Sequence, residues 1–226
     1  MRRGLRSRYA MADKTGVRGC IFDVDGVLLD SIPAYRRAWA SWAIEHVVEE
    51  RAIWAVAHGR RPVDIIRATA GHLNETAALR RFEILIEAGY EQVNAVAGAR
   101  EILERLPRSA WAVATSGDRR LVERAFHRLR LPQPHVGVYG EDVTSGKPDP
   151  SCYLLAARRM GLRPGECAVI EDAPTGVAAG KAAGMTVIAV TTTHGAEELP
   201  QADQVHRSLH EVAVTVSAGL RHLPDR

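Results

Sequence analysis

The sequence has few cysteines, few aromatic residues and no long apolar run. Its three cysteines, Cys20, Cys152 and Cys167, stand far apart and form no CxxC pair. We therefore expect reduced, buried thiols rather than the disulfide framework of a small secreted domain. Aromatic residues make up 5% of the chain, too few for the stacking platforms that bind single-stranded nucleic acid. Because no run of about 18 apolar residues occurs, we expect no membrane-spanning helix.

The chain also lacks a strong charge of one sign. Its net charge is +3, but four arginines and no acidic residue stand in the first ten residues, and removing those arginines leaves −1 for residues 11–226. This basic start lacks the apolar segment of a secretory signal. We expect residues 1–16 to be a disordered tail, with Met11 as a candidate start, on a soluble cytoplasmic protein that binds neither nucleic acid nor membranes.

Short apolar runs alternate with helical patterns along most of the chain. Runs at 17–23, 110–115, 136–139, 167–171 and 186–190 predict buried strands. Helical patterns lie between them at 97–106, 119–129, 150–160 and 175–183, and Gly161 and Gly184 close the last two. The alternation predicts an α/β fold, a doubly wound parallel sheet with helices on both faces.

One interval, from residue 32 to residue 96, contains no strand-like run. Its apolar residues recur at helical spacing instead: Tyr35, Trp39, Trp42 and Val47 behind Ser31 and Pro33 as a candidate cap, then Leu79, Phe82 and Ile86 behind Asn74. We expect these aromatic residues to form a core rather than a ligand site. The sequence predicts an all-helical insertion at 32–95 within a core domain made of 17–31 and 96–226.

Acidic residues end two of the predicted strands. Asp23 and Asp25 end the first, where a spacing of two puts both side chains on one side of an extended chain, and Glu171 and Asp172 end the fourth. Ligands bind at the carboxyl ends of parallel strands, and buried carboxylates that lie together need a compensating cation. Oxygen ligands suit Mg²⁺, which leaves room for a phosphate substrate. For Asp23 and Asp25 taken alone, a solvated acidic turn is the alternative.

Two further sites favour a phosphate ligand. Thr115 and Ser116 follow another strand and offer a hydroxyl and backbone amides at the start of a helix, which is suited to an anion. Lys147 lies in a proline-rich loop that can aim one ammonium group. Phosphoryl transfer needs such cations and donors, an Asp can accept phosphate covalently, and a second Asp can act as general acid and base.

Four segments, in order, resemble the motifs of the haloacid dehalogenase superfamily: FDVDGVLLDS at 22–31, VATSG at 113–117, GKPDP at 146–150 and VIEDAPTGV at 169–177. The resemblance implies a Rossmann-like core and makes the insertion similar to that superfamily's helical cap. It also implies that Asp23 is the nucleophile and Asp25 the general acid and base. Dehalogenases lack the second Asp because halide needs no proton, so Asp25 argues for a phosphate ester substrate.

The resemblance assigns the remaining motif residues as well. It implies that Thr115 holds the transferring phosphoryl group and that Lys147 bridges nucleophile and phosphate, with Ser116 and Gly117 as candidate substrate-binding residues. Asp172 would complete a Mg²⁺ site with Asp23 and the backbone carbonyl of Asp25. Glu171 would either reach the metal through water or tune the site.

The segment His58-Gly59-Arg60-Arg61 interrupts the helical insertion. It resembles the His-Gly-x-Arg element in the caps of sugar and polyol phosphatases of the superfamily, which act on 2-deoxyglucose 6-phosphate, glycerol phosphate and related esters. The resemblance implies that His58, Gly59 and Arg61 contact the substrate, with Arg60 as a further candidate. A loop with solvated arginines is the alternative. The expected partner is a small phosphate ester, bound by a monomer.

Three other functions fit the sequence less well. A β-phosphoglucomutase has similar core motifs but a cap loop of a Gly-Val-Ser-Arg type, which this sequence lacks. A phospho-accepting receiver domain has its acidic pair before the acceptor Asp and has no helical insertion. A binding protein without catalysis is disfavoured because no required residue type is missing.

Overall fold

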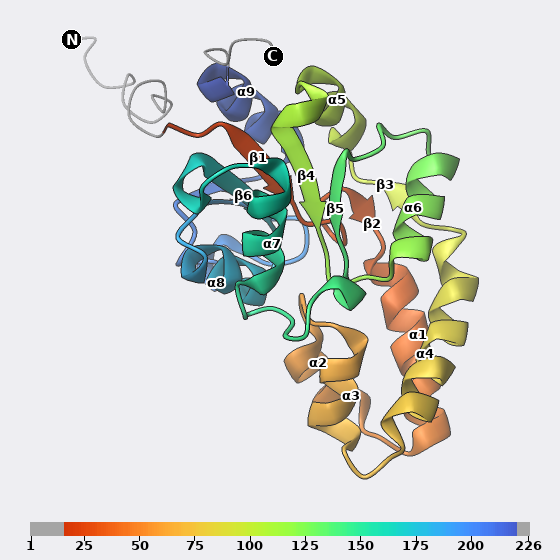
Figure 1. Ribbon diagram of the computed structural model, residues 1–226. Coiled ribbons are helices and arrows are strands. Elements are labelled where there is room, and N and C mark those ends of the chain that lie inside the picture. Colours follow the sequence, from red (N-terminus) through yellow and green to blue (C-terminus); the bar gives the residue numbers. More distant parts are fainter. Residues whose placement is uncertain (1–15, 221–226) are drawn as a thin grey trace, which may run out of the picture.

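The computed structural model describes residues 16–220 (Figure 1). Residues 1–15, most of the expected tail, and candidate start Met11 lie outside the described residues. The strands are β1 (Gly19–Phe22), β2 (Leu29–Asp30), β3 (Asn94–Ala95), β4 (Trp111–Ala114), β5 (Val136–Val138), β6 (Cys167–Glu171), β7 (Thr186–Val190) and β8 (Gln204–His206). The helices are α1 (Ile32–His46), α2 (Glu50–Ala57), α3 (Pro62–Ala70), α4 (Glu75–Tyr90), α5 (Ala99–Arg105), α6 (Arg119–Arg128), α7 (Ser151–Met160), α8 (Pro174–Ala182) and α9 (Leu209–Leu220).

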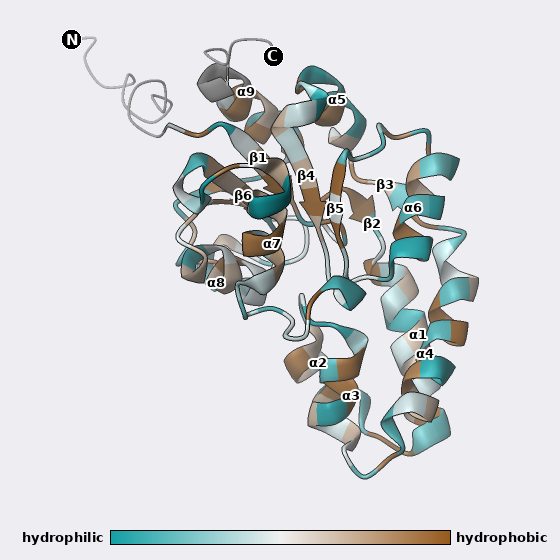
Figure 2. Cartoon of the chain, viewed as in Figure 1, coloured by the Kyte–Doolittle hydropathy of each residue, from teal (hydrophilic) through white to brown (hydrophobic). Residues whose placement is uncertain are grey.

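Six strands form one parallel sheet in the order β5-β4-β1-β6-β7-β8. In β1, Cys20 and Phe22 belong to one apolar cluster and Ile21 to the other, because successive side chains of a strand point to opposite faces. Helices α7 and α8 pack on one face, while α5, α6 and α9 cover the other. Both faces of the sheet are therefore buried, and the α/β doubly wound class is confirmed. In Figure 2, β5 has a hydrophobic colour over much of its length.

Helices α1 to α4, which we call the cap, stand at one end of the sheet (Figure 1). Trp39 stacks on Phe82 with 4.0 Å between ring centroids, and the Trp42 indole N–H donates to the carbonyl of Ala78 at 2.9 Å. All three aromatic side chains are buried. They hold α1 against α4, as the helical spacing predicts. The division into two domains at 32–95 stays a prediction.

Two details of this interval differ from the sequence-based expectation. A strand is present after all, because β3 pairs antiparallel with β2 and so ties together the two links between cap and core. Two paired residues are too few to produce a strand pattern in the sequence. Val47, expected on the buried stripe, is 95% exposed because α1 ends before it and its φ of 55° turns the chain away.

Other local predictions have mixed outcomes. Gly161 and Gly184 follow the ends of α7 and α8 with positive φ, as expected, and all three cysteines are buried and free. Strand β8 and helix α9 were not anticipated. Among the described residues, no helix combines the length and the apolar character needed to cross a membrane.

Candidate active site

A cavity of about 60 Å³ lies where the cap meets the carboxyl ends of the central strands. Its core wall includes Asp23, Asp25, Thr115, Ser116 and Asp172. Its cap wall includes Tyr35, Trp39, Trp54, His58, Gly59 and Arg60. Parallel strands bring their carboxyl ends to one edge of the sheet, which is why residues separated by about 150 positions line a single cavity.

Lys147 joins two buried carboxylates, one of which, Asp23, lines this cavity. Its Nζ donates to Asp23 Oδ1 at 2.6 Å and to Glu171 Oε1 at 2.7 Å, and all three side chains are buried. Burial alone would lower the pKa of Lys147, but Asp23 and Glu171 more than offset this and raise it well above its ordinary value. Burial raises the pKa of Asp23, and Lys147 acts against that rise. The ammonium therefore stays charged beside the proposed nucleophile.

Glu171 has both of its oxygens occupied. Oε1 accepts from Lys147 and from the Tyr153 hydroxyl at 2.7 Å, and Oε2 accepts from the backbone N–H groups of Asp172 and Ala173. Of the two roles expected for Glu171, this geometry favours tuning, because it fixes the position of Lys147.

Asp172, unlike Glu171, has one oxygen without a hydrogen-bond partner. Its Oδ1 is buried without any hydrogen-bond partner, while Oδ2 accepts from the Thr193 hydroxyl. Burial, together with the charges of Glu171 and Asp23, raises the pKa of Asp172 well above its ordinary value. One oxygen each of Asp23, Glu171 and Asp172 lies within 4.8 Å of the others. An orphaned buried oxygen among three carboxylates fits a hard cation such as Mg²⁺.

Gly26 makes room for this acidic group. Its φ is +87°, and a Cβ there would stand 2.2 Å from Asp172 Oδ2. A side chain at this turn would push Asp172 out of place.

Asp25 is held by hydroxyl groups from both core and cap. Oδ1 accepts from Ser31 at 2.5 Å and from Tyr90 at 2.9 Å, and Oδ2 accepts more weakly from Thr115 at 3.3 Å and Tyr35 at 3.4 Å. Burial raises the pKa of Asp25, against the effect of these donors. Ser31 stands at the N-terminus of α1 as predicted, but its backbone is helical rather than extended and its side chain makes no capping hydrogen bond. Its hydroxyl donates to Asp25 instead.

The loop after β4 takes the position predicted for a phosphate site. Thr115 is buried, and its Oγ1 accepts from the backbone N–H of Gly117 at 3.0 Å. The Ser116 hydroxyl donates to the carbonyl of Gly59 at 2.8 Å and thus touches the cap. A Cβ at Gly117 would lie 3.1 Å from Asp25 Oδ2, so this loop and Asp25 pack together.

The two arginines of the cap loop have different surroundings. Arg60 lines the cavity, and its Nε is buried without a hydrogen-bond partner. Arg61 does not line this cavity. Its guanidinium binds Asp64 and the carbonyls of a core loop. The structure thus places Arg60 at the cavity and Arg61 on Asp64 and the core loop. The expectation that Arg61 contacts the substrate stays a prediction.

His58 also faces the cavity, next to a residue that sequence reasoning missed. The rings of His58 and His194 make an edge contact with 4.5 Å between centroids. Burial, followed by the nearby His194, lowers the pKa of His58. Thr193 and His194 follow β7. The expectation that ligands bind at the carboxyl ends of parallel strands could therefore have found them too. Tyr90 and Tyr153 gave no sequence signal, since neither follows a strand.

Comparison with known proteins agrees with this geometry. Residues 17–184 match the haloacid dehalogenase-like hydrolase family. The chain is similar to hexitol phosphatase A of Escherichia coli, with 40% identity over 204 residues that cover 88% of this chain and 94% of the relative. It is similar to glycerol-1-phosphate phosphohydrolase 2 of Saccharomyces cerevisiae, with 34% identity over 195 residues, 78% of this chain and 76% of the relative.

A solved hydrolase from Pseudomonas syringae has a similar fold, with a TM-score of 0.78 and 25% identity, and the match covers 87% of this chain and 95% of that one. The family match includes all four motifs and the cap. The chain belongs to the haloacid dehalogenase-like hydrolases.

Proposed function

We propose that the protein is a Mg²⁺-dependent phosphatase that hydrolyses a small sugar or polyol phosphate through a phosphoaspartate. The observation that carries this proposal is the buried pair of Asp23 and Lys147 at a cavity that Asp25 also lines and the cap covers. These residues supply a nucleophile, a fixed cation and a general acid in one enclosed space.

The Asp23 carboxylate attacks phosphorus. Oδ1 is held by Lys147, and no described residue donates a hydrogen bond to the second oxygen, which is free to form the bond to phosphorus. As the P–O ester bond breaks, Asp25 gives its proton to the leaving alcohol oxygen. Water then attacks the phosphoaspartate, gives a proton to Asp25 and releases phosphate, which regenerates both carboxyl groups.

Asp25 is suited to this exchange because burial favours its protonated form, while four hydroxyl donors stabilise the carboxylate that it becomes. Thr115 and the loop up to Gly117 offer donors to the phosphoryl oxygens.

Asp23, Asp172 and the backbone carbonyl of Asp25 would hold the Mg²⁺. When bound, the ion neutralises part of the charge on the phosphoryl oxygens. Asp172 Oδ1, which has no partner otherwise, is the group on this chain that most requires it.

The substrate class is inferred from the cap and from the relatives. The cap wall offers His58 and Arg60 as polar groups among the apolar surfaces of Tyr35, Trp39 and Trp54, which suits hydroxyl groups on a short carbon chain. The relatives are named for hexitol phosphate and glycerol 1-phosphate. We also infer a monomer in a reducing compartment such as the cytoplasm, because one chain supplies the whole site and the cysteines are free.

The test is phosphate release from a panel of hexitol, glycerol, hexose and pentose phosphates, with Asp23→Asn as the control. We expect turnover of at least one polyol or sugar ester and less than a hundredth of it in Asp23→Asn, whose thermal unfolding should remain cooperative. A panel without phosphate release, or a fully active Asp23→Asn, would overturn the proposal.

A β-phosphoglucomutase function is less favoured, because the named relatives are phosphatases. Incubation with β-glucose 1-phosphate and a trace of the 1,6-bisphosphate separates the two. We expect free phosphate. Accumulation of glucose 6-phosphate without phosphate release would show a mutase.

A further inference from the structure

We propose that Arg61 is a positioning residue that fastens the cap to the core and holds the loop before Lys147, and that it does not read the substrate. The inference rests on the proposed phosphatase function for its kinetic consequences. The fastening itself follows from the contacts of one guanidinium group.

All five N–H groups of Arg61 are used within the protein. Nε and Nη2 donate to the two oxygens of Asp64 at 2.7 and 2.9 Å. Nη2 also donates to the carbonyl of Thr144 at 2.7 Å, and Nη1 donates to those of Val143 at 2.6 Å and Gly140 at 3.4 Å. A guanidinium has no further donor, so none remains for a substrate hydroxyl or phosphate.

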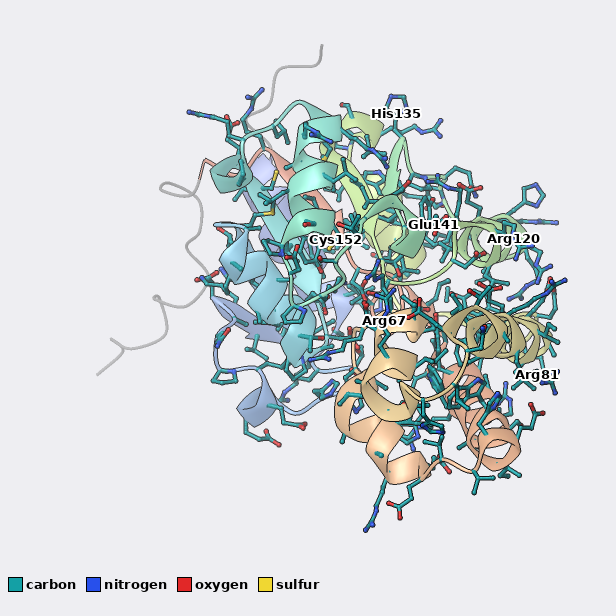
Figure 3. All side chains as sticks on the ribbon, turned by 60° about the horizontal axis from the view of Figure 1, so that its bottom comes forward. Arg67, Arg81, Arg120, His135, Glu141 and Cys152 are labelled. Carbon is teal, nitrogen blue, oxygen red and sulfur yellow. The ribbon has the colours of Figure 1, made fainter. Side chains whose placement is uncertain are left out.

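These contacts cross from cap to core. Arg61 and Asp64 belong to the cap, whereas the three carbonyls belong to the core loop 140–144. Figure 3 labels Glu141 in this loop and Arg67 on α3, on the two sides of the junction. Arg61 is only 7% exposed, so this charge is satisfied by Asp64 and the carbonyl dipoles rather than by water. Lysine lacks the planar fork that reaches a carboxylate and three carbonyls at once.

The same ion pair packs against the residue before the catalytic lysine. A Cβ at Gly146 would lie 2.6 Å from Asp64 Oδ2 and 2.7 Å from Arg61 Nε. A side chain at position 146 would displace the Arg61–Asp64 pair, and Lys147 is the next residue. The position of Lys147 is therefore coupled to the docked cap.

Two core hydroxyls fasten the same cap loop. Ser116 donates to the carbonyl of Gly59 at 2.8 Å, and Thr175 donates to the carbonyl of His58. Ser116 adjoins Thr115, and Thr175 lies three residues after Asp172. Three core segments close in sequence to Thr115, Lys147 and Asp172 thus bind one short segment, 58–61, and docking of the cap aligns them together.

This arrangement makes a kinetic prediction that a substrate contact would not make. Loss of Arg61 should weaken docking for every substrate, because docking precedes the chemistry of all of them. Loss of a contact to the sugar or polyol should penalise only substrates that carry those hydroxyl groups. Arg60, the adjacent arginine with an unpartnered Nε at the cavity, is the matched control.

The experiment compares Arg61→Lys, Arg61→Ala and Arg60→Ala in the full chain, using a hexitol phosphate, glycerol phosphate and p-nitrophenyl phosphate. We expect both Arg61 variants to lower kcat/KM at least tenfold, by the same factor within about twofold for all three esters. Arg60→Ala should lower kcat/KM for the polyol esters several times more than for p-nitrophenyl phosphate. A selective loss in the Arg61 variants, or no loss, would overturn the proposal.

Hydrogen exchange provides a readout that needs no turnover. We expect Arg61→Lys to speed amide exchange at 57–65 and 139–149 at least fivefold, with β6 and β7 unchanged. Unchanged exchange in both segments would refute the fastening. If Arg61→Ala does not fold, Thr175→Val provides the second variant, and it should show the same uniform but smaller loss of kcat/KM. A wild-type chain inactive on every ester would reject the phosphatase function, whereas the exchange result would still decide the fastening.

Discussion

Glu171 illustrates how a single residue takes its role from contacts that the sequence does not contain. The IED segment predicts an acidic strand end and leaves open whether Glu171 reaches a metal or tunes the site. In the fold, Lys147 and Tyr153 share one oxygen and two backbone amides share the other. One of its partners is Lys147, which is 24 residues away in sequence, so these contacts depend on the fold.

Replacing Glu171 with Gln should be costly, because one of the two oxygens becomes an amide N–H₂ that faces buried donors, either Lys147 and Tyr153 or two backbone N–H groups. We expect unfolding free energy to fall by roughly 3 kcal/mol and activity to fall more than tenfold. Tyr153→Phe is the matched control, since it removes one hydrogen bond but keeps the charge, at a cost of about 1–2 kcal/mol. Denaturant titration measures both, and equal stability of the two variants would contradict this role.

Glu166 allows a pH prediction at the surface. Arg163, through its side chain and its backbone N–H, lowers the pKa of Glu166 from 4.5 to about 2. A carboxyl with a depressed pKa stabilises the fold above its unfolded value and loses that contribution as pH falls from about 4.5 toward 2. Unfolding titrations should therefore show wild type more stable than Glu166→Gln at pH 6, with the difference shrinking below pH 4.5. A difference independent of pH would contradict the assignment.

At the scale of elements, the core strands and the residues at their carboxyl ends are the features of the site that the sequence predicts best. The core strands are apolar on both faces, so their runs are visible in the sequence, and their carboxyl ends mark the site. Strands β2 and β3 have two residues each and depend on each other for pairing, so no local pattern predicts them. The two predicted helix caps also differ in outcome: the Asn74 side chain caps α4, whereas the Ser31 side chain makes no capping hydrogen bond.

Asn74 caps α4 with its side chain, which accepts from the backbone N–H of Ala77 at 3.0 Å. Asn74→Ala should lower the unfolding free energy by about 1 kcal/mol, because one N–H at the helix start loses its acceptor. Asn74→Ser keeps a capping oxygen and should stay close to wild type. Urea titration of the three proteins is the measurement, and equal losses in both variants would argue against the cap.

At the scale of the whole molecule, the site exists only where the cap meets the loops that follow β1, β4, β6 and β7. The buried carboxylates of Asp23, Glu171 and Asp172 face one ammonium, Lys147. This excess of negative charge is the reason to expect a cation in the working enzyme.

Removal of divalent ions should therefore abolish phosphate release, and added Mg²⁺ should restore it. Mg²⁺ should also raise the thermal unfolding midpoint in a concentration-dependent manner, since it binds the folded chain and relieves the repulsion among the acids. Asp172→Asn should reduce both effects. Activity that persists in excess chelator would refute the metal site.

The sequence by itself determined the α/β class and the order of the core strands β1, β4, β5, β6 and β7 along the chain. It also predicted the helical insertion and the site residues Asp23, Asp25, Thr115, Lys147 and Asp172, whose roles stay proposals. The fold class and the insertion depend on local patterns, namely apolar runs and helical spacing, whereas the roles of the site residues came from the four motifs that resemble the superfamily. Only the tertiary structure decided that Arg60 faces the cavity while Arg61 binds the core, that Ser31 serves Asp25 instead of a helix, and that Tyr90, Tyr153 and His194 adjoin the site. Each of these features is a contact between residues that are distant in sequence. Such contacts are set by tertiary packing and not by the neighbouring residues in the chain.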